Sequence, residues 1–283
     1  MDSQIPQQTL SKEVSLSGKA LYSGKEVVLR LIPAGKDHGI RFVRSDLPGR
    51  PEVHAHIKNI SQAPFGFHCT ALGNRAPMIY PTEHLLAACY GLGLSNLTIL
   101  LEGEELPFFD GSAKPMVEVL QAAGVISQKA PARSLTVRKK IEIKGDSGEI
   151  LLEPSDRGFF LQYFLESSHP HIGRQQYQYF WNPEHFVNEI AAARTFCTEN
   201  EAEEFLKQGG RGGSTQNCLV FGKSGPLENK LRFPEEPARH KILDCLGDLA
   251  LLGYNLKGKL VARRSGHRLN TLLVKKLLEE TEA

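Results

Sequence analysis

The chain has 283 residues, 41% of them hydrophobic and 23% charged, which is an ordinary composition for a soluble globular protein. A formal net charge of +2, with the basic residues scattered along the chain, argues against a nucleic-acid-binding protein. The length exceeds that of one typical hydrophobic core, so two domains are expected.

The N-terminus and the cysteines favour a cytoplasmic protein. No basic segment followed by an apolar one begins the chain, and the apolar run 246–254 is too short to span a bilayer. The five cysteines are odd in number and form no Cys-x-x-Cys, so neither a disulfide framework nor a structural cysteine zinc site is expected. A monomer is expected, because no apolar stripe is left over.

The first half predicts strands followed by a helix, a strand and a second helix. Its β-branched and aliphatic segments predict strands at residues 26–32, 40–43, 53–57 and 96–102. A helix is predicted at 82–90, where Thr82 could cap its start and Gly91 and Gly93 would end it. A second helix is predicted at 114–123, before Gly124.

Residues 127–133 have linker composition, and a similar order of elements follows them. Strands are predicted at 135–143, 149–153, 159–165, 218–221 and 259–262, and helices at 183–192, 240–253 and 270–280. We therefore expect an α+β protein with two similar two-layer domains, residues 1–129 and 134–283, related by an internal duplication.

Two distant segments supply the residue types of a metal site. His240 and Asp244 are four residues apart in a predicted helix, so their side chains lie on one face and can reach one cation. His84 adds a second imidazole from the corresponding helix of the first half. Two His and one carboxylate make a catalytic zinc set with an open position for water, which Glu83 could deprotonate.

Each segment alone also has a plain structural interpretation. His240, Asp244 and Asp248 could form a solvated polar helix face. Glu83 would favour a helix N-terminus through the helix dipole, and His84 could be a hydrogen-bonded core histidine. The pairs His54-x-His56 and His169-x-His171 have no carboxylate in helical register and are interpreted as non-metal.

Other residues fit around such a metal. Asp248 lies one turn beyond Asp244, at a spacing suited to orienting a second group. His267 follows Gly266 at a loop end, where a neighbouring Asp would keep it protonated. Thr195 and Lys241 could donate to a tetrahedral oxyanion. The glycine-rich loop 209–214 lacks the Lys-Ser/Thr ending of a P-loop, so nucleotide triphosphate binding is not expected.

Five segments together resemble the zinc-dependent UDP-3-O-acyl-N-acetylglucosamine deacetylase family. They are Pro81-Thr82-Glu83-His84-Leu85-Leu86-Ala87-Ala88, Phe109-Asp110-Gly111-Ser112-Ala113, Ala193-Arg194-Thr195-Phe196, His240-Lys241-Ile242-Leu243-Asp244-x-x-Gly247-Asp248 and Ser265-Gly266-His267-x-Leu269-Asn270. The resemblance implies removal of the N-acetyl group from a UDP-linked, 3-O-hydroxyacylated glucosamine, the committed step of lipid A synthesis in Gram-negative bacteria. It also implies helices packed between the two domains and a βαβ insert in the second domain that forms an acyl-chain passage.

The resemblance also implies roles for single residues. His84, His240 and Asp244 would be the ligands of Zn²⁺, and Glu83 the general base. His267, backed by Asp248, would be the cation that assists the oxyanion and the leaving amine. The expected substrate contacts are Thr195 to the oxyanion, Lys241 and Arg264 near the phosphates, and Phe196, Gly213 and Ser214 in the acyl passage. Cys69 matches a cysteine that can lie near the metal.

The chain departs from the family pattern at three positions. Tyr22 stands where the family commonly has His, and Ser167 where it has a Phe that could stack on uracil, so that contact is not assigned. Arg264 replaces a usual Lys, which keeps the charge but changes its geometry. Two other functions therefore remain open: a zinc amidohydrolase acting on another acylated sugar, and a non-enzymatic α+β protein that binds RNA.

Overall fold

Alternation of apolar and polar residues builds the first of two large sheets in the computed structural model, which describes residues 5–64 and 66–282. In β3 (Glu26–Pro33), Val27, Leu29 and Leu31 are buried and the residues between them are exposed. The sheet has the order β2-β3-β9-β4-β5, in which only β9 and β4 are parallel. Its other strands are β2 (Val14–Lys19), β4 (Ile40–Arg44), β5 (Glu52–His54) and β9 (Leu97–Leu101).

The second sheet repeats this arrangement. Its order is β12-β13-β19-β14-β15, in which the central β19–β14 pair is again parallel and the other neighbours are antiparallel; β11 (Ser134–Thr136) also pairs with β19, in parallel. The strands are β12 (Ile141–Lys144), β13 (Glu149–Glu153), β14 (Phe159–Glu166), β15 (Arg174–Phe180) and β19 (Asn255–Arg263). The α+β class with two similar halves is confirmed. Their shared topology supports the predicted duplication, which stays an inference.

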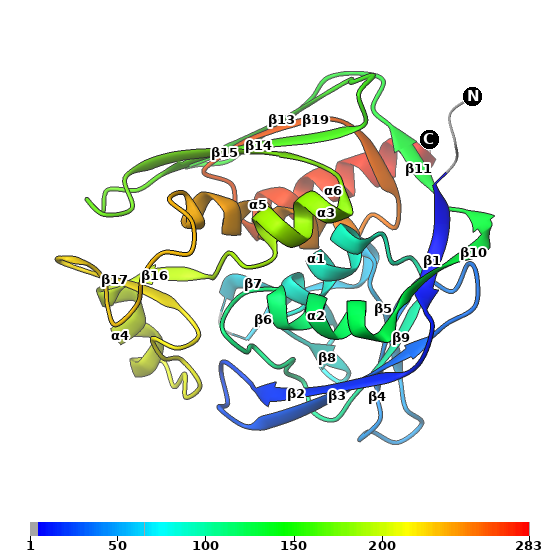
Figure 1. Ribbon diagram of the computed structural model, residues 1–283, viewed down its shortest axis with the longest axis horizontal. Coiled ribbons are helices and arrows are strands. Elements are labelled where there is room, and N and C mark those ends of the chain that lie inside the picture. Colours follow the sequence, from blue (N-terminus) through cyan, green and yellow to red (C-terminus); the bar gives the residue numbers. More distant parts are fainter. Residues whose placement is uncertain (1–4, 65, 283) are drawn as a thin grey trace.

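The helices lie between the two sheets, as the resemblance implied (Figure 1). They are α1 (Glu83–Leu92) and α2 (Lys114–Ala123) from the first half, and α5 (Glu236–Ala250) and α6 (His267–Glu282) from the second. Every residue of α1 is buried, because α5 packs directly on it. A Cβ at Gly247 would lie 2.1 Å from the carbonyl oxygen of Glu83, so only glycine allows the two helices to approach this closely.

The predicted βαβ insert projects from one end of the second half (Figure 1). β16 (Phe196–Thr198) pairs in parallel with β17 (Leu219–Gly222), and α4 (Glu199–Lys207) connects them. Thr198 and Glu201 form a reciprocal capping box at the start of α4. β18 (Gly225–Pro226) completes this small sheet.

Several predicted boundaries are wrong. The linker 127–133 is largely strand β10 (Val125–Pro131), which pairs with β1 (Pro6–Leu10); its partner lies far away in sequence, so local composition could not reveal it. The predicted strand 135–143 is divided between β11 and β12. The predicted helix 183–192 is one turn, α3 (Pro183–His185), followed by a π-helix, η2 (Phe186–Ile190). The helix around His240 begins earlier, at Glu236.

A 3₁₀ helix and a small third sheet complete the first half. The strand predicted at 53–57 ends at His54, and a 3₁₀ helix, η1 (Ile57–Asn59), follows it. A three-stranded sheet contains β6 (Ile60–Ala63), β7 (Gly66–Gly73) and β8 (Met78–Ile79). The prediction that Thr82 caps α1 is wrong for its side chain. Its hydroxyl instead donates to the carbonyl of Thr70 in β7. Within the described ranges, no helix is long and apolar enough to cross a membrane.

Candidate metal centre and active site

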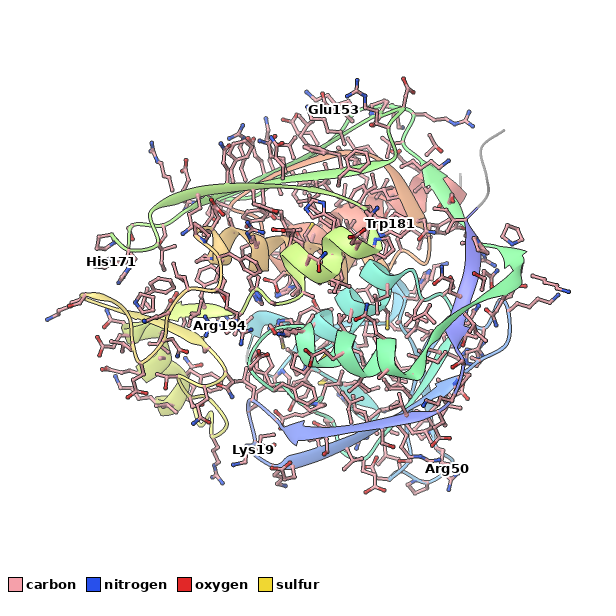
Figure 2. All side chains as sticks on the ribbon, viewed as in Figure 1. Lys19, Arg50, Glu153, His171, Trp181 and Arg194 are labelled. Carbon is pink, nitrogen blue, oxygen red and sulfur yellow. The ribbon has the colours of Figure 1, made fainter. Side chains whose placement is uncertain are left out.

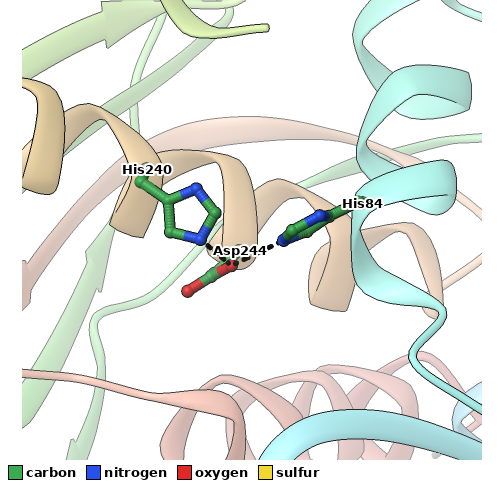
Figure 3. A group of neighbouring side chains, drawn as sticks. All are labelled: His84, His240 and Asp244. Carbon is green, nitrogen blue, oxygen red and sulfur yellow. Dashed lines mark ion pairs between the residues drawn. The ribbon is translucent and has the colours of Figure 1, made fainter. Parts of the chain in front are cut away.

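His84, His240 and Asp244 converge where α1 and α5 cross (Figure 3). Their candidate ligand atoms all lie within 4.8 Å of one another. Asp244 Oδ1 is 3.2 Å from His240 Nε2 and 3.9 Å from His84 Nε2. One turn of α5 separates His240 from Asp244, which is the predicted spacing on one helix face.

The interpretation of this stripe as a solvated polar face is wrong. His84, His240 and Asp244 are only 4%, 3% and 4% exposed, and Asp248 is fully buried. Burial, and then the neighbouring His240, lower the pKa of His84 to about 3, so its imidazole is neutral at physiological pH. His240 Nδ1 lies 3.0 Å from the carbonyl oxygen of Ala193, which can only accept. Nδ1 therefore carries the proton, and Nε2 offers its lone pair.

The three donors fit a small divalent metal. A tetrahedral ion with bonds of about 2.0–2.1 Å would hold its ligand atoms roughly 3.3 Å apart. The distances from Asp244 Oδ1 to the two Nε2 atoms, 3.2 and 3.9 Å, bracket that separation. Two neutral imidazoles and a carboxylate form the donor set of catalytic zinc sites, in which a fourth position stays open.

Lys241 neutralises the second oxygen of Asp244. Its Nζ lies 2.6 Å from Asp244 Oδ2, and its side chain is largely buried. Burial by itself raises the pKa of Asp244, but Lys241 and His240 overcome this effect and hold it well below its usual value. The carboxylate is therefore ionised, as a metal ligand must be.

Glu83 lies beside the candidate metal ligand His84, at the first position of α1. Its Oε2 accepts a hydrogen bond of 2.9 Å from the backbone N–H of Thr70. Burial is the largest influence on the pKa of Glu83 and raises it to about 7, with His267 opposing the rise. A carboxylate with this pKa gains and loses a proton near neutral pH, as a general base should.

His267, the first residue of α6, forms a hydrogen-bonded group with Asp248. Its Nδ1 donates to Asp248 Oδ2 at 2.9 Å. Asp248 also accepts from the Thr70 hydroxyl and from Asn270 Nδ2. Burial disfavours the charged imidazole, but the charge and hydrogen bond of Asp248 outweigh it and raise the pKa of His267 to about 9. Asp248 therefore contacts His267 directly, and its role in orienting that residue stays a prediction.

Thr195 and Phe196 lie on the segment that orients His240. Ala193, whose carbonyl accepts from His240, is two residues before Thr195, and the Thr195 N–H donates to the carbonyl of Gly111 at 2.7 Å. The Phe196 ring centroid is 6.4 Å from that of His240. Both residues are therefore near the candidate centre, while the predicted oxyanion contact of Thr195 stays a prediction.

Gly213 and Ser214 lie in the insert, on the loop after α4. This loop pairs with the first half: Arg211 donates to the carbonyl of Tyr22, and Gly212 to that of Leu21. The predicted passage residues therefore lie where the insert meets the N-terminal half. Their contact with an acyl chain stays a prediction.

Arg264 lies apart from the candidate metal ligands, directly after the last residue of β19. Its exposed side chain lines a cavity of about 330 Å³ with two other cations, Lys144 and Arg263, and two carboxylates, Glu149 and Glu166. Arg263 stacks over Phe164 and approaches Glu149, whereas Arg264 enters no ion pair among the described residues. Its guanidinium is thus available to an anion.

Tyr22 and Ser167 stand where the family commonly has His and Phe, and the structure shows their contacts. The buried phenol of Tyr22 hydrogen-bonds the thiol of Cys69, and burial raises the pKa of that thiol. Cys69 precedes Thr70 in β7 and is close enough to Glu83 for the carboxylate to contribute to this rise. Ser167 lies in the β14–β15 turn, where its hydroxyl accepts from the N–H of His169.

Sequence reasoning missed two structural supports of the site. Thr70 contacts Glu83, Asp248 and His267 together, and no local pattern marks it. Arg194, at the base of the insert (Figure 2), forms a buried ion pair with Glu236, the first residue of α5. In the sequence, Arg194 is marked only by its place in the motif Ala193-Arg194-Thr195-Phe196, because its partner lies 42 residues away.

Comparisons with known proteins agree with this geometry. The family described as UDP-3-O-acyl N-acetylglycosamine deacetylase matches residues 7–279. The chain belongs to this deacetylase family. Curated relatives bearing the name UDP-3-O-acyl-N-acetylglucosamine deacetylase include those of Anaeromyxobacter sp. (strain Fw109-5), 39% identical, and Myxococcus xanthus, 38% identical. These alignments cover 97% of this chain and 89% and 87% of the two relatives. The deacetylase of Wolinella succinogenes is 37% identical over 99% of this chain and 92% of its own length.

Proposed function

We propose that the protein is a zinc-dependent hydrolase that removes the N-acetyl group from UDP-3-O-[(3R)-3-hydroxyacyl]-N-acetylglucosamine. The products are the free amine and acetate, and the reaction is the committed step of lipid A synthesis. Membership of the deacetylase family supports the substrate class. The observation that carries the proposal is the buried group of His84, His240 and Asp244 with Glu83 and His267 beside it.

In this proposal His84, His240 and Asp244 would hold the metal through imidazole nitrogens and a carboxylate oxygen. When bound, zinc supplies a Lewis acid that lowers the pKa of water to about 7 and polarises a carbonyl. Glu83 takes the proton from the attacking water, and its pKa of about 7 suits that task. The Lys241 ammonium keeps Asp244 ionised, and its second proposed role is to help hold the substrate near its phosphates.

His267 is the proposed cation on the other side of the reacting amide. Its pKa of about 9 keeps it protonated at neutral pH, so it stabilises the oxyanion and carries a proton for the leaving amine. Glu83, once protonated, is a second source of that proton. Asp248 acts by positioning His267 and maintaining its charge. The Thr195 hydroxyl donates to the oxyanion.

The rest of the substrate extends away from the metal in two directions. Arg264, at its cavity, binds the negatively charged diphosphate; its guanidinium has no ion-pair partner among the described residues, which supports this role. Phe196, Gly213 and Ser214 line the passage for the acyl chain, supported by the position of Phe196 beside His240. We further propose that domains 1–129 and 134–283 work as one monomer in the cytoplasm of a Gram-negative bacterium; the five free cysteines are consistent with a reducing compartment.

Deacetylation of defined UDP-sugars by the purified protein tests this function. Release of acetate should occur from the 3-O-acylated UDP-N-acetylglucosamine, stop after chelation, and return with zinc. UDP-N-acetylglucosamine without the acyl chain is the matched control and should react far more slowly. Equal rates on both sugars, or turnover only on a different acylated sugar, would support the broader amidohydrolase and reject the proposed substrate.

A further inference from the structure

Two thiols lie in contact at the base of the insert. Cys197 is in β16, and Cys218 directly precedes β17. Their Sγ atoms are 3.4 Å apart, and both residues are half-buried. The other three cysteines, Cys69, Cys89 and Cys245, are buried. Parallel pairing of β16 with β17 keeps Cys197 and Cys218 together, so their contact is part of the fold.

The arrangement suits reversible oxidation. A disulfide bond is about 2.05 Å long, so the two sulfur atoms need to approach by only about 1.4 Å. The hydrogen bond from Cys218 lowers the pKa of Cys197, and this effect outweighs the opposing effect of burial. Cys197 is therefore the thiol that ionises first and attacks an oxidant. Both thiols retain some solvent access, unlike the three buried cysteines.

The pair also lies at a sensitive place. Cys197 directly follows Phe196, and the N–H of Leu219, next to Cys218, donates to the carbonyl of Thr195. The 21-residue separation between the cysteines encloses α4 and the loop with Gly213 and Ser214. A bond between the two sulfurs would close this segment into a covalent loop beside the candidate active site.

We propose that Cys197 and Cys218 are a redox modification site, at which a small disulfide oxidant joins them reversibly and thereby restrains the insert. The Cys197 thiolate attacks one sulfur of the oxidant and releases the first small thiolate. The Cys218 sulfur, on losing its proton, then attacks Cys197 and releases the second. Two electrons pass from the protein to the oxidant, and the two protons end on the two small thiols. In a reducing compartment the dithiol is the resting form.

Disulfide mapping tests the site independently of any enzymatic activity. The full-length protein is incubated with glutathione disulfide, blocked with an alkylating agent and digested with trypsin. Cleavage after Arg194, Lys207, Arg211 and Lys223 gives peptides 195–207 and 212–223, each with one cysteine. We expect these two peptides to be linked, and dithiothreitol to separate them. Mixed disulfides with glutathione only, or links to another cysteine, would overturn the proposal.

The effect on turnover rests on the proposed function and is measured separately. Oxidised protein should deacetylate the 3-O-acylated UDP-sugar about ten-fold more slowly. Small displacements of reacting groups can lower a reaction rate by up to about 10²-fold. Dithiothreitol should restore the rate, and Cys218→Ser should resist oxidation while retaining activity. Linked peptides with an unchanged deacetylation rate would overturn the claim that the disulfide restrains the insert. Absence of activity in the reduced protein as well would instead count against the proposed function and leave the mapped disulfide intact.

Discussion

Replacing Asp248 by Asn should shift the alkaline limit of activity to lower pH. The amide keeps the size and an acceptor oxygen for His267 but removes the buried charge that favours its protonated form. Asn270 and Thr70 still surround the position. The substitution therefore changes the electrostatics of His267 with little change in packing.

The pKa values of Glu83 and His267 set the two limits of the active pH range, and the loss of Asp248 moves the upper one. In the unmodified protein, Glu83 with a pKa of about 7 must be ionised and His267 with a pKa of about 9 must be protonated. Activity should rise as pH passes about 7 and fall as it passes about 9. Without Asp248, burial remains and the main opposing influence is lost, so the upper limit should move down by about 2 pH units. The pH range in which both groups are correctly protonated then nearly disappears.

The assay is the pH dependence of kcat/KM for the acylated UDP-sugar, between pH 5.5 and 10, with zinc in every buffer. Asp146→Asn removes an almost fully exposed carboxylate and is the matched control, for which no shift is expected. Thermal unfolding at each pH checks that the variants stay folded. An unchanged alkaline limit in Asp248→Asn would refute the assignment of that limit to His267.

Three further substitutions test other parts of the site. Glu83→Ala should retain the metal but lower kcat by about 10²–10⁴-fold; near-normal turnover would remove Glu83 as the base. Gly247→Ala should destabilise the fold by at least about 1–3 kcal/mol and weaken metal binding, because its Cβ meets the Glu83 carbonyl; Gly35→Ala, with open space around it, is the control in thermal unfolding. Arg194→Met should lower the free energy of unfolding, measured by chemical denaturation, by about 3–5 kcal/mol, because it leaves Glu236 buried without its partner. A second change, Glu236→Leu, should recover part of this loss. Equal stability of the single and double variants would contradict this reasoning.

The sequence was sufficient for features that depend on local spacing. His240, Asp244 and Asp248 are one turn apart, so a helix alone places them on one face. Strands were likewise predicted at 26–32 and 159–165, and the structure has β3 and β14 there, with buried residues alternating with less buried ones. The residue types and the similar order of elements in the two halves also suggested that His84 meets this face from the other half of the chain, and the structure brings the three side chains together.

Features that depend on distant partners could not be predicted from local patterns. Residues 127–133 resemble a linker, and only the distant β1 makes them a strand. Thr70 has no local signature, yet it joins Glu83 to the Asp248–His267 pair. The π-helix at 186–190 is also invisible to helical periodicity, although its Glu189 holds Arg239 beside His240. In each case long-range packing decides the local structure.

The central claim is that His84, His240 and Asp244 hold one catalytic zinc ion. The most direct test is the metal content of purified protein by mass spectrometry after dialysis, compared with Asp244→Ala and Glu83→Ala. We predict about one zinc per chain in the unmodified protein and in Glu83→Ala, and almost none in Asp244→Ala, since a catalytic site with three protein ligands loses its metal with one of them. Full zinc occupancy in Asp244→Ala, or no zinc in the unmodified protein after loading, would contradict the claim.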